Sequence, residues 1–439
     1  MSDTYYIETY GCQMNVRDSE IIAGTLQKIG FQPSSDKEGS TLILFNTCCV
    51  RDHAERRVFG NVGALAEYKE NHPEAIIGIC GCMMQQKDVA KKMFQRFPFV
   101  DMIFGTNQLH RLPEFIDSVR NGNRVLSVPS DLTTVEERLP SIRTNPINSF
   151  VNIAFGCNNY CTYCIVPYVR GPERSRQPED ILNEIRELVE GGMTEITLLG
   201  QNVNSYGSDL NHITFAGLLK QVSDIDGLRR IRFMTSHPKD LSDELIETIA
   251  ALDNVCHHVH LPLQSGSDRI LKLMNRHYDM ARYESIVHKL RASMKDVEIT
   301  TDLIVGFPDE QEDDFEKTIQ AVRTIGFSSA FTFKYSPRQG TVAANMPNQI
   351  PECVKKARLA ELNRTQQEIS DQSNQGYIGF EGIVHVEGHD TRNKPQYYGK
   401  YSNFKMVYFE SDKDISGQYV PVRVTGTRPN ALTGRLLES

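Results

Sequence analysis

Alternation of short apolar segments with amphipathic helical segments is the feature that most constrains the fold. Residues 4–10, 41–45 and 75–80 are apolar or β-branched runs, and helical patterns separate them. A helical crossover joins parallel neighbouring strands, and such crossovers are right-handed. The pattern predicts a doubly wound, parallel-sheet α/β domain over residues 1–125, with Asp18 as the N-cap of its first helix.

The rest of the chain predicts two further domains. A link rich in Pro, Thr and Arg at residues 139–146 is followed by six strand-like runs, which alternate with helical patterns. Six such units predict an open (β/α)6 barrel over residues 143–372, with its site at the C-terminal ends of the strands. Residues 373–439 are rich in β-branched and aromatic residues with frequent Gly turns, which indicates a small all-β barrel.

Charge and hydropathy exclude several classes of protein. No apolar run approaches the roughly 18 residues of a membrane span, and the start of the chain lacks a basic and apolar leader. We therefore expect no membrane association and a cytoplasmic location. The net charge of −8 argues against a surface that binds nucleic acid everywhere. Any contact with RNA is expected to be local.

Three of the ten cysteines lie on one short loop. Cys157, Cys161 and Cys164 follow the first strand of the predicted (β/α)6 barrel, in the run GCNNYCTYC. Three thiolates can hold three irons of a 4Fe–4S cluster and leave the fourth iron open. A zinc site normally takes four protein ligands, and no fourth Cys or His lies near this loop. Cys256 and Cys353 have no partner pattern, so we interpret them as inert.

A second trio follows three strands of the first domain. Cys12, Cys48 and Cys82 each come after a predicted strand. Because ligands bind beyond the carboxyl ends of strands in an open parallel sheet, these cysteines are expected to converge. Cys49 and Cys80 compete for the same assignment, and we interpret both as small buried residues because free Cys packs as a small hydrophobe.

Several long motifs resemble one known family. They are TYGCQMN (9–15), FNTCCVR (45–51), GCNNYCTYCIVPYVRG (156–171), TSHP (235–238) and HLPLQSGSDRIL (260–271). The chain resembles radical S-adenosylmethionine methylthiotransferases over essentially its whole length. The resemblance implies a methylthiotransferase N-terminal domain, a radical core and a C-terminal TRAM barrel. GCQMN and LQSGSDRILKLMNR resemble the branch that modifies isopentenyl-adenosine in tRNA.

The resemblance implies a reaction and its cofactors. It implies two 4Fe–4S clusters, one on each cysteine trio, together with S-adenosyl-L-methionine. The radical cluster would cleave S-adenosylmethionine to a 5′-deoxyadenosyl radical, which takes hydrogen from carbon 2 of the adenine. The second cluster would present the sulfur, and a second S-adenosylmethionine would methylate it. The cofactors carry the hard chemistry, so no acid or base side chain is required. The implied partners are the tRNA anticodon stem-loop, an external electron donor and a sulfur source, and the expected state is a monomer.

Candidate S-adenosylmethionine contacts lie at strand ends and on the cysteine loop. Gln201 stands where related enzymes often carry an acidic residue that holds the methionine amine. Ile304 belongs to a stretch that matches the family's adenine-binding strand except at its first position. The cofactor-binding candidates are Tyr163, Gln201, Ser236, Gln264, Ser265 and Ile304. Each polar residue among them could instead satisfy a turn or cap a helix.

Other functions stay open at this point. The substrate could be threonylcarbamoyl-adenosine of tRNA or a ribosomal protein. A non-catalytic iron–sulfur protein that binds RNA is a different class, but such a module needs neither six barrel units nor a second trio. The C-terminal domain mixes basic and aromatic residues as small RNA-binding barrels do. The candidates are Arg392, Lys394, Lys400, Lys405, Arg423, Arg428 and Arg435, with Tyr397, Tyr398, Tyr401 and Phe404.

Overall fold

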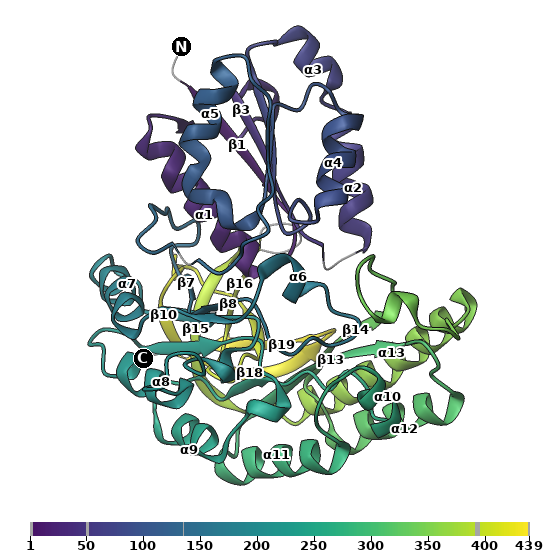
Figure 1. Ribbon diagram of the computed structural model, residues 1–439. Coiled ribbons are helices and arrows are strands. Elements are labelled where there is room, and N and C mark those ends of the chain that lie inside the picture. The colour runs from purple at the N-terminus through teal and green to yellow at the C-terminus, as the bar shows by residue number, and fades with distance from the viewer. Residues whose placement is uncertain (1–2, 50–51, 135, 391–395, 438–439) are drawn as a thin grey trace.

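The N-terminal part is a six-stranded parallel sheet with helices on both faces. The computed structural model describes residues 3–49, 52–134, 136–390 and 396–437. In Figure 1 the N-terminal part lies above the rest of the molecule. The sheet order is β2-β1-β3-β4-β5-β6, so the order reverses beside β1 and creates a topological switch point between β1 and β3. The strands are β1 (Thr4–Thr9), β2 (Gln32–Pro33), β3 (Leu42–Thr47), β4 (Ile76–Gly81), β5 (Met102–Phe104) and β6 (Val125–Ser127).

The predicted doubly wound domain is confirmed, with two differences in its helices. The first helix begins directly after Cys12, which is its N-cap, so the prediction of Asp18 as N-cap is wrong. Asp18 is buried inside that helix, where its carboxylate pairs with Arg170. The helical segment between β3 and β4 divides into two helices. The helices are α1 (Gln13–Lys28), α2 (Asp52–Gly63), α3 (Ala66–Asn71), α4 (Lys87–Arg96) and α5 (Leu112–Arg120).

The central part is the expected open barrel of six parallel strands. Its strands form two sheets, β11-β10-β7 and β12-β13-β14, and an isolated bridge between Ile231 and Val255 lies between them. Within the described residues, the edge strands β7 and β14 do not pair with each other, so the barrel stays open. The strands are β7 (Asn148–Asn152), β10 (Glu195–Leu199), β11 (Arg230–Phe233), β12 (His258–His260), β13 (Glu298–Val305) and β14 (Ser329–Lys334).

Helices cover the outside of this barrel (Figure 1). Gln201, just after the C-terminal end of β10, contacts Met14 of the N-terminal part. A short hairpin, β8 (Ala154–Phe155) with β9 (Arg174–Ser175), brackets the cysteine loop and the short helix α6 (Val166–Arg170). The outer helices are α7 (Pro178–Glu190), α8 (Phe215–Ser223), α9 (Asp243–Ala251), α10 (Asp268–Leu273), α11 (Met280–Ser293), α12 (Glu312–Ile325) and α13 (Glu352–Gln375). None of the described helices has the length and apolar character needed to cross a membrane.

The C-terminal part is a closed five-stranded barrel, as predicted. Its strand order is β15-β16-β17-β19-β18, and its core contains residues such as Val384, Val407 and Phe409. The strands are β15 (Glu381–Asp390), β16 (Gln396–Lys400), β17 (Met406–Phe409), β18 (Tyr419–Arg428) and β19 (Ala431–Leu436).

A buried charge network attaches this small barrel to the central one. Arg230 donates to the main-chain carbonyls of Ile383 and Lys400 at 2.7 and 2.8 Å, and Arg232 donates to those of Tyr401 and Ser402 at 3.1 and 3.0 Å.

Glu195 completes this network between the two barrels. Its carboxylate accepts from Arg232 at 2.8 Å and contacts His385 Nδ1 at 2.9 Å. Burial alone would raise the pKa of Glu195, but Arg232 and His385 lower it to about 2. Glu195 and Arg232 therefore form a buried ion pair at the contact between the two barrels.

Candidate functional site

The second cysteine trio lies at the switch point of the N-terminal sheet. Cys12, Cys48 and Cys82 follow β1, β3 and β4, which are adjacent strands. Cys48 and Cys82 are buried, whereas Cys12 is exposed. The parallel sheet thus brings the three positions to one edge although the sequence separates them widely.

Asn15 and Gly11 organise this edge. The thiols of Cys12 and Cys82 lie 3.7 and 3.9 Å from Asn15 Oδ1, and Asn15 Nδ2 donates to Thr47 O at 2.9 Å. Gly11 has φ +116°, and a Cβ at this position would lie 2.8 Å from Cys48 Sγ. Only glycine lets the turn after β1 approach Cys48 this closely. Asn15 therefore lies near the thiols of both Cys12 and Cys82, and Gly11 lets the turn before Cys12 approach Cys48.

A buried arginine from the central barrel reaches the same edge. Arg170, at the end of α6, donates from Nε to Cys82 Sγ at 3.1 Å and from Nη2 to Asn15 Oδ1 at 3.3 Å. The same Nη2 forms an ion pair with Asp18 at 2.7 Å. Hydrogen bonds to ligand sulfurs and nearby charge both tune an iron–sulfur cluster. Sequence reasoning did not find Arg170, although it follows Cys164 by only six residues.

Cys49 and Cys80 differ in their surroundings. Cys80 is buried on the opposite face of the sheet, in the core that contains Ile22 and Phe104. Cys49 hydrogen-bonds to Cys82, and this contact raises the pKa of Cys49 well above its usual value. The same contact lowers the pKa of Cys82, and Arg170 lowers it further. Burial acts in the opposite direction, and the pKa of Cys82 is about 6. Cys49 is therefore in direct contact with one member of the trio, in addition to being packed in the core.

We expect single substitutions to separate ligands from neighbours in this trio. Cys48→Ala and Cys82→Ala should each lose the N-terminal cluster, whereas Cys80→Ala and Cys49→Ala should keep it. The reason is that Cys48 lies against Gly11 beside Cys12, and Cys80 points away from the edge. Iron content and the visible absorption spectrum, measured in a background that lacks the other trio, check this. Loss of the cluster in Cys49→Ala with retention in Cys48→Ala would reverse the assignment.

The loop of Cys157, Cys161 and Cys164 is held from several sides. Gly156 has φ +73°, and a Cβ there would lie 2.0 Å from the carbonyl oxygen of Pro172. Asn159 Nδ2 donates to Cys157 Sγ at 3.3 Å.

Contacts from outside the loop also fix its shape. Thr162 Oγ1 donates to Leu273 O at 2.9 Å, and Asn275 Nδ2 donates to the carbonyls of Asn159 and Tyr160 at 3.2 and 3.1 Å. The three thiols are thus presented on a braced loop at the open end of the barrel.

The electrostatics of this loop suit a bound metal cluster. Burial and the neighbouring Cys161 raise the pKa of Cys164 to about 12, so its thiolate needs a cation to become stable. Arg276 is buried and donates to Cys161 Sγ at 3.4 Å. Among the described residues, no three His, Cys, Asp or Glu side chains surround one ion position. A four-iron cluster instead takes single thiolates at separate corners.

Unpartnered polar atoms gather at the C-terminal ends of the barrel strands. Sixteen buried side-chain polar atoms lack a hydrogen-bond partner in the described part of the chain, and six of them lie in the loops that follow β10, β11 and β12. Buried polar groups are normally paired, so such a concentration fits a missing polar ligand. Three of the six residues, Gln201, Ser236 and Gln264, are predicted cofactor contacts. The six are Gln201, Asn202, Asn204, Ser236, His237 and Gln264.

His237 is a further polar group in this region, and it is not among the contacts predicted from the sequence. Its Nδ1 accepts from the main-chain N–H of Lys239 at 3.2 Å, so Nε2 carries the hydrogen. Burial and the charge of Arg276 lower the pKa of His237 to about 2, which keeps the ring neutral. The Nε2 donor is buried and unpartnered. The TSHP motif was the only signal in the sequence that could have found it.

The remaining predicted contacts occupy different surroundings. Ser265 accepts from the main-chain N–H of Ser267 at 3.2 Å and lies 3.4 Å from Thr318 Oγ1, so it is satisfied inside a turn. Tyr163 and Ile304 pack against the same small apolar cluster beside the cysteine loop. The structure thus brings Tyr163 and Ile304 together and leaves Ser265 without a free polar atom.

The two cysteine trios face a common junction. Gln201 Nε2 donates to Met14 Sδ, which lies two residues after Cys12. Arg170 crosses the same junction from the barrel to Cys82. Both contacts join the end of the barrel to the edge of the N-terminal sheet.

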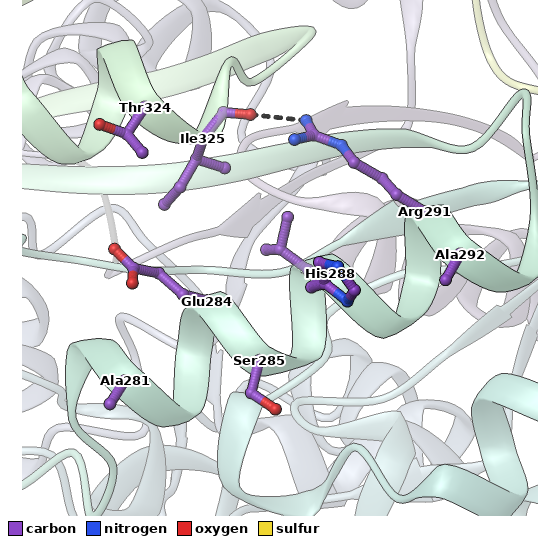
Figure 2. Close-up of a pocket in the computed structure, with 9 residues that line it drawn as sticks. Ala281, Glu284, Ser285, His288, Arg291, Ala292, Thr324 and Ile325 are labelled. Atoms are coloured by element: carbon purple, nitrogen blue, oxygen red, sulfur yellow. Dashed lines mark hydrogen bonds between the residues drawn. The ribbon is translucent and has the colours of Figure 1, made fainter.

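A large surface hollow lies elsewhere. It has a volume of about 780 Å³ and is lined by one side of α11 with Thr324 and Ile325 at the end of α12 (Figure 2). Arg291 Nη2 donates to the carbonyl of Ile325 across it. No cysteine of either trio lines this hollow, which lies between two outer helices.

Two family models match the chain. Residues 151–322 match the Radical SAM superfamily, and residues 4–105 match a family described as Uncharacterized protein family UPF0004. The first match contains the loop of Cys157, Cys161 and Cys164. The second contains Cys12, Cys48 and Cys82.

Full-length relatives are similar to the whole chain. A protein of Caldicellulosiruptor saccharolyticus named tRNA-2-methylthio-N(6)-dimethylallyladenosine synthase is 49% identical over 99% of this chain and 92% of its own length. A Clostridium botulinum protein of the same name is 48% identical over 98% of this chain and 96% of its own length. These alignments span all three parts of the structure.

Solved structures share the fold at low sequence identity. The radical S-adenosylmethionine methyltransferase TsrM from Kitasatospora setae has a TM-score of 0.57 and 12% identity, covering 90% of this chain and 80% of its own. The cobalamin-dependent S-adenosylmethionine radical enzyme OxsB has a TM-score of 0.54 and 12% identity, covering 84% of this chain and 56% of its own.

Proposed function

Because the chain belongs to the tRNA-2-methylthio-N(6)-dimethylallyladenosine synthase family, we propose that it replaces the hydrogen on carbon 2 of a dimethylallyl-adenosine in tRNA by a methylthio group. The observation that supports this proposal is the contact between the two domains that carry the cysteine trios, where Arg170 donates to Cys82 and Gln201 donates to Met14. A reaction that joins radical chemistry to sulfur insertion needs two such centres side by side.

We propose that the two trios hold two 4Fe–4S clusters, each with one iron left open. Cys157, Cys161 and Cys164 would hold the radical cluster, and Cys12, Cys48 and Cys82 the auxiliary one. When bound, the clusters and S-adenosylmethionine supply the one-electron, sulfur-transfer and methyl-transfer chemistry. Buried Arg276 and Arg170 would each donate a hydrogen bond to one ligand sulfur and offset its negative charge.

The protein side chains at the strand ends would bind and orient S-adenosylmethionine. Gln201, Ser236 and Gln264 offer buried acceptor atoms without partners, and His237 offers a buried N–H donor. Tyr163 and Ile304 would provide an apolar wall beside them. These groups bind and position the cofactor and exclude water, and none is assigned a proton transfer.

We further propose the partners of the reaction. The tRNA would bind through its anticodon stem-loop, an external donor would supply electrons, and a separate source would restore the sulfur. The protein would act as a cytoplasmic monomer. The proposed domains are 1–125, 143–372 and 373–439, with β6 continuing the first sheet to Ser127 and α13 reaching Gln375 before the last domain.

The RNA-binding face of the small barrel is narrower than the sequence suggested. Arg392 and Lys394 lie outside the described residues. Tyr401 is buried, Phe404 stacks on His258 of the central barrel at 4.3 Å, and Lys405 is buried beside Asn374. These three therefore serve the core or the attachment of the small barrel.

Tyr397 is also buried, and Lys400 and Arg423 form ion pairs with Glu387 and Glu381. The predicted Tyr398, Arg428 and Arg435 are left for contact with RNA, and the structure adds Tyr408 to them. Tyr398 and Tyr408 lie 5.8 Å apart on the outside of the barrel, and Arg428 covers the ring of Tyr408 at 3.3 Å. Arg435 is exposed. We propose that these residues contact the tRNA through stacking and phosphate binding.

Arg428→Ala should weaken tRNA binding and lower the slope of log affinity against log salt by about one, because one phosphate contact is lost. Filter binding at several salt concentrations measures both. Arg111→Ala is a matched control, since Arg111 also covers an aromatic ring, that of Phe115, but on the N-terminal domain. Equal losses in both variants would contradict a specific role of the small barrel.

The direct test of the function uses reduced, cluster-loaded enzyme with tRNA that carries dimethylallyl-adenosine. Nucleoside mass analysis should show the methylthio derivative of that nucleoside. Methylthiolation of threonylcarbamoyl-adenosine instead, or of no nucleoside, would overturn the proposal.

A further inference from the structure

The last strand of the central barrel presents two large aromatic side chains to open space. Phe331 and Phe333 on β14 are 54% and 42% exposed. Side chains alternate along a strand, and Thr332 between them donates to Asn363 of the outer helix α13. Phe331 and Phe333 therefore point to the other face of the strand, into the open barrel.

The surroundings of these rings connect them to the candidate site. In the parallel register, Phe331 lies beside Asp302 and Phe333 beside Ile304. The ring of Phe331 meets that of His260 edge-on, with centroids 6.0 Å apart. Ile304 packs against the apolar cluster that also includes Tyr163 from the cysteine loop. The two rings thus form one wall of the space in front of the radical site.

Further exposed apolar side chains lie along the same region. Tyr160 on the cysteine loop and Tyr168 on α6 have ring centroids 6.1 Å apart, and both are 48% exposed. Val342 is exposed, and its neighbour Ala343 donates from its main-chain N–H to Thr162 of the loop. An exposed apolar patch of this kind marks a binding surface.

We propose that Phe331 and Phe333 bind the dimethylallyl group of the target adenosine. This inference rests on the proposed function, because the adenine must approach the junction of both trios. The dimethylallyl group is a branched five-carbon chain with no polar atom, so it matches an aromatic wall and cannot use the polar groups at the strand ends. A base or phosphate would instead seek the unpartnered donors and acceptors nearby.

Binding of two RNAs tests this proposal. The probes are one anticodon stem-loop with dimethylallyl-adenosine and the same stem-loop with plain adenosine, bound to the cluster-loaded full chain. The wild-type protein should prefer the dimethylallyl RNA by about 10- to 100-fold, as expected for partial burial of five carbons. Phe331→Ala with Phe333→Ala should lose at least about ten-fold of this preference.

Two further variants serve as controls for this test. Phe331→Leu with Phe333→Leu retains an apolar wall and should keep most of the preference, which separates binding from misfolding. Leu126→Ala removes an exposed apolar side chain on the N-terminal sheet and should change nothing. An equal loss of affinity for both RNAs in the alanine variant would mean that the rings stack on bases, and it would overturn the proposal.

The proposed function can fail separately from this inference. If wild-type enzyme does not methylthiolate the dimethylallyl stem-loop, the proposed function is wrong. If it does so and the alanine variant keeps the full preference, only the assignment of Phe331 and Phe333 is wrong.

Discussion

Replacement of Cys157, Cys161 and Cys164 together by alanine should abolish reductive cleavage of S-adenosylmethionine. These side chains are the only thiols that the braced loop presents at the open end of the barrel, within the described residues. Without them, Arg276 and the unpartnered polar groups at the strand ends remain, but no cluster can be held there. Iron per chain should fall from about eight to about four.

The measurement is 5′-deoxyadenosine formation by reduced protein, together with iron analysis. Cys353→Ala is the matched control, because Cys353 is exposed on α13 and far from either trio along the chain. The control should keep full activity and full iron. Retention of all iron in the triple variant would refute two separate cluster sites.

The opposite triple variant should separate the two halves of the reaction. With Cys12, Cys48 and Cys82 replaced by alanine, the protein should still cleave S-adenosylmethionine but form no methylthio product. The radical loop keeps its own contacts, and Arg170 keeps its ion pair with Asp18 at 2.7 Å, so α6 stays attached to the N-terminal domain.

Mass analysis of the tRNA nucleosides and of 5′-deoxyadenosine in one sample measures both halves. Cys80→Ala serves as the control, since Cys80 is buried on the other face of the same sheet and its loss tests packing alone. Methylthiolated nucleoside from the triple variant would refute the assignment of sulfur insertion to this trio. Loss of cleavage as well would mean that the auxiliary trio supports the radical site structurally.

The overall architecture could be predicted because it depends on short-range patterns. Strands β3 and β4 are buried along their whole length, so they read as continuous apolar runs. Once those strands are parallel neighbours, the convergence of Cys12, Cys48 and Cys82 at one edge follows from topology. The glycine-rich β segments of the C-terminal domain likewise indicated a barrel without any knowledge of its contacts.

Groups whose role depends on distant partners could not be predicted in this way. Asp18 has the sequence signature of a helix cap, but its carboxylate pairs with Arg170, which lies 152 residues away. Arg276 and His237 gain their roles only from the loops that fold around them. Tyr401 and Lys405 looked like RNA contacts, whereas packing of the small barrel buries both. Composition does not distinguish such residues from a binding face.

The attachment of the small barrel bears on how this enzyme can change during evolution. Arg230 and Arg232 hold that barrel through main-chain carbonyls of Ile383, Lys400, Tyr401 and Ser402. A main-chain carbonyl is present whatever side chain its residue carries. Substitutions at positions such as Lys400 and Ser402 therefore leave the anchor intact. Mutational drift can alter the outer face of the small barrel while these main-chain contacts with the catalytic core persist.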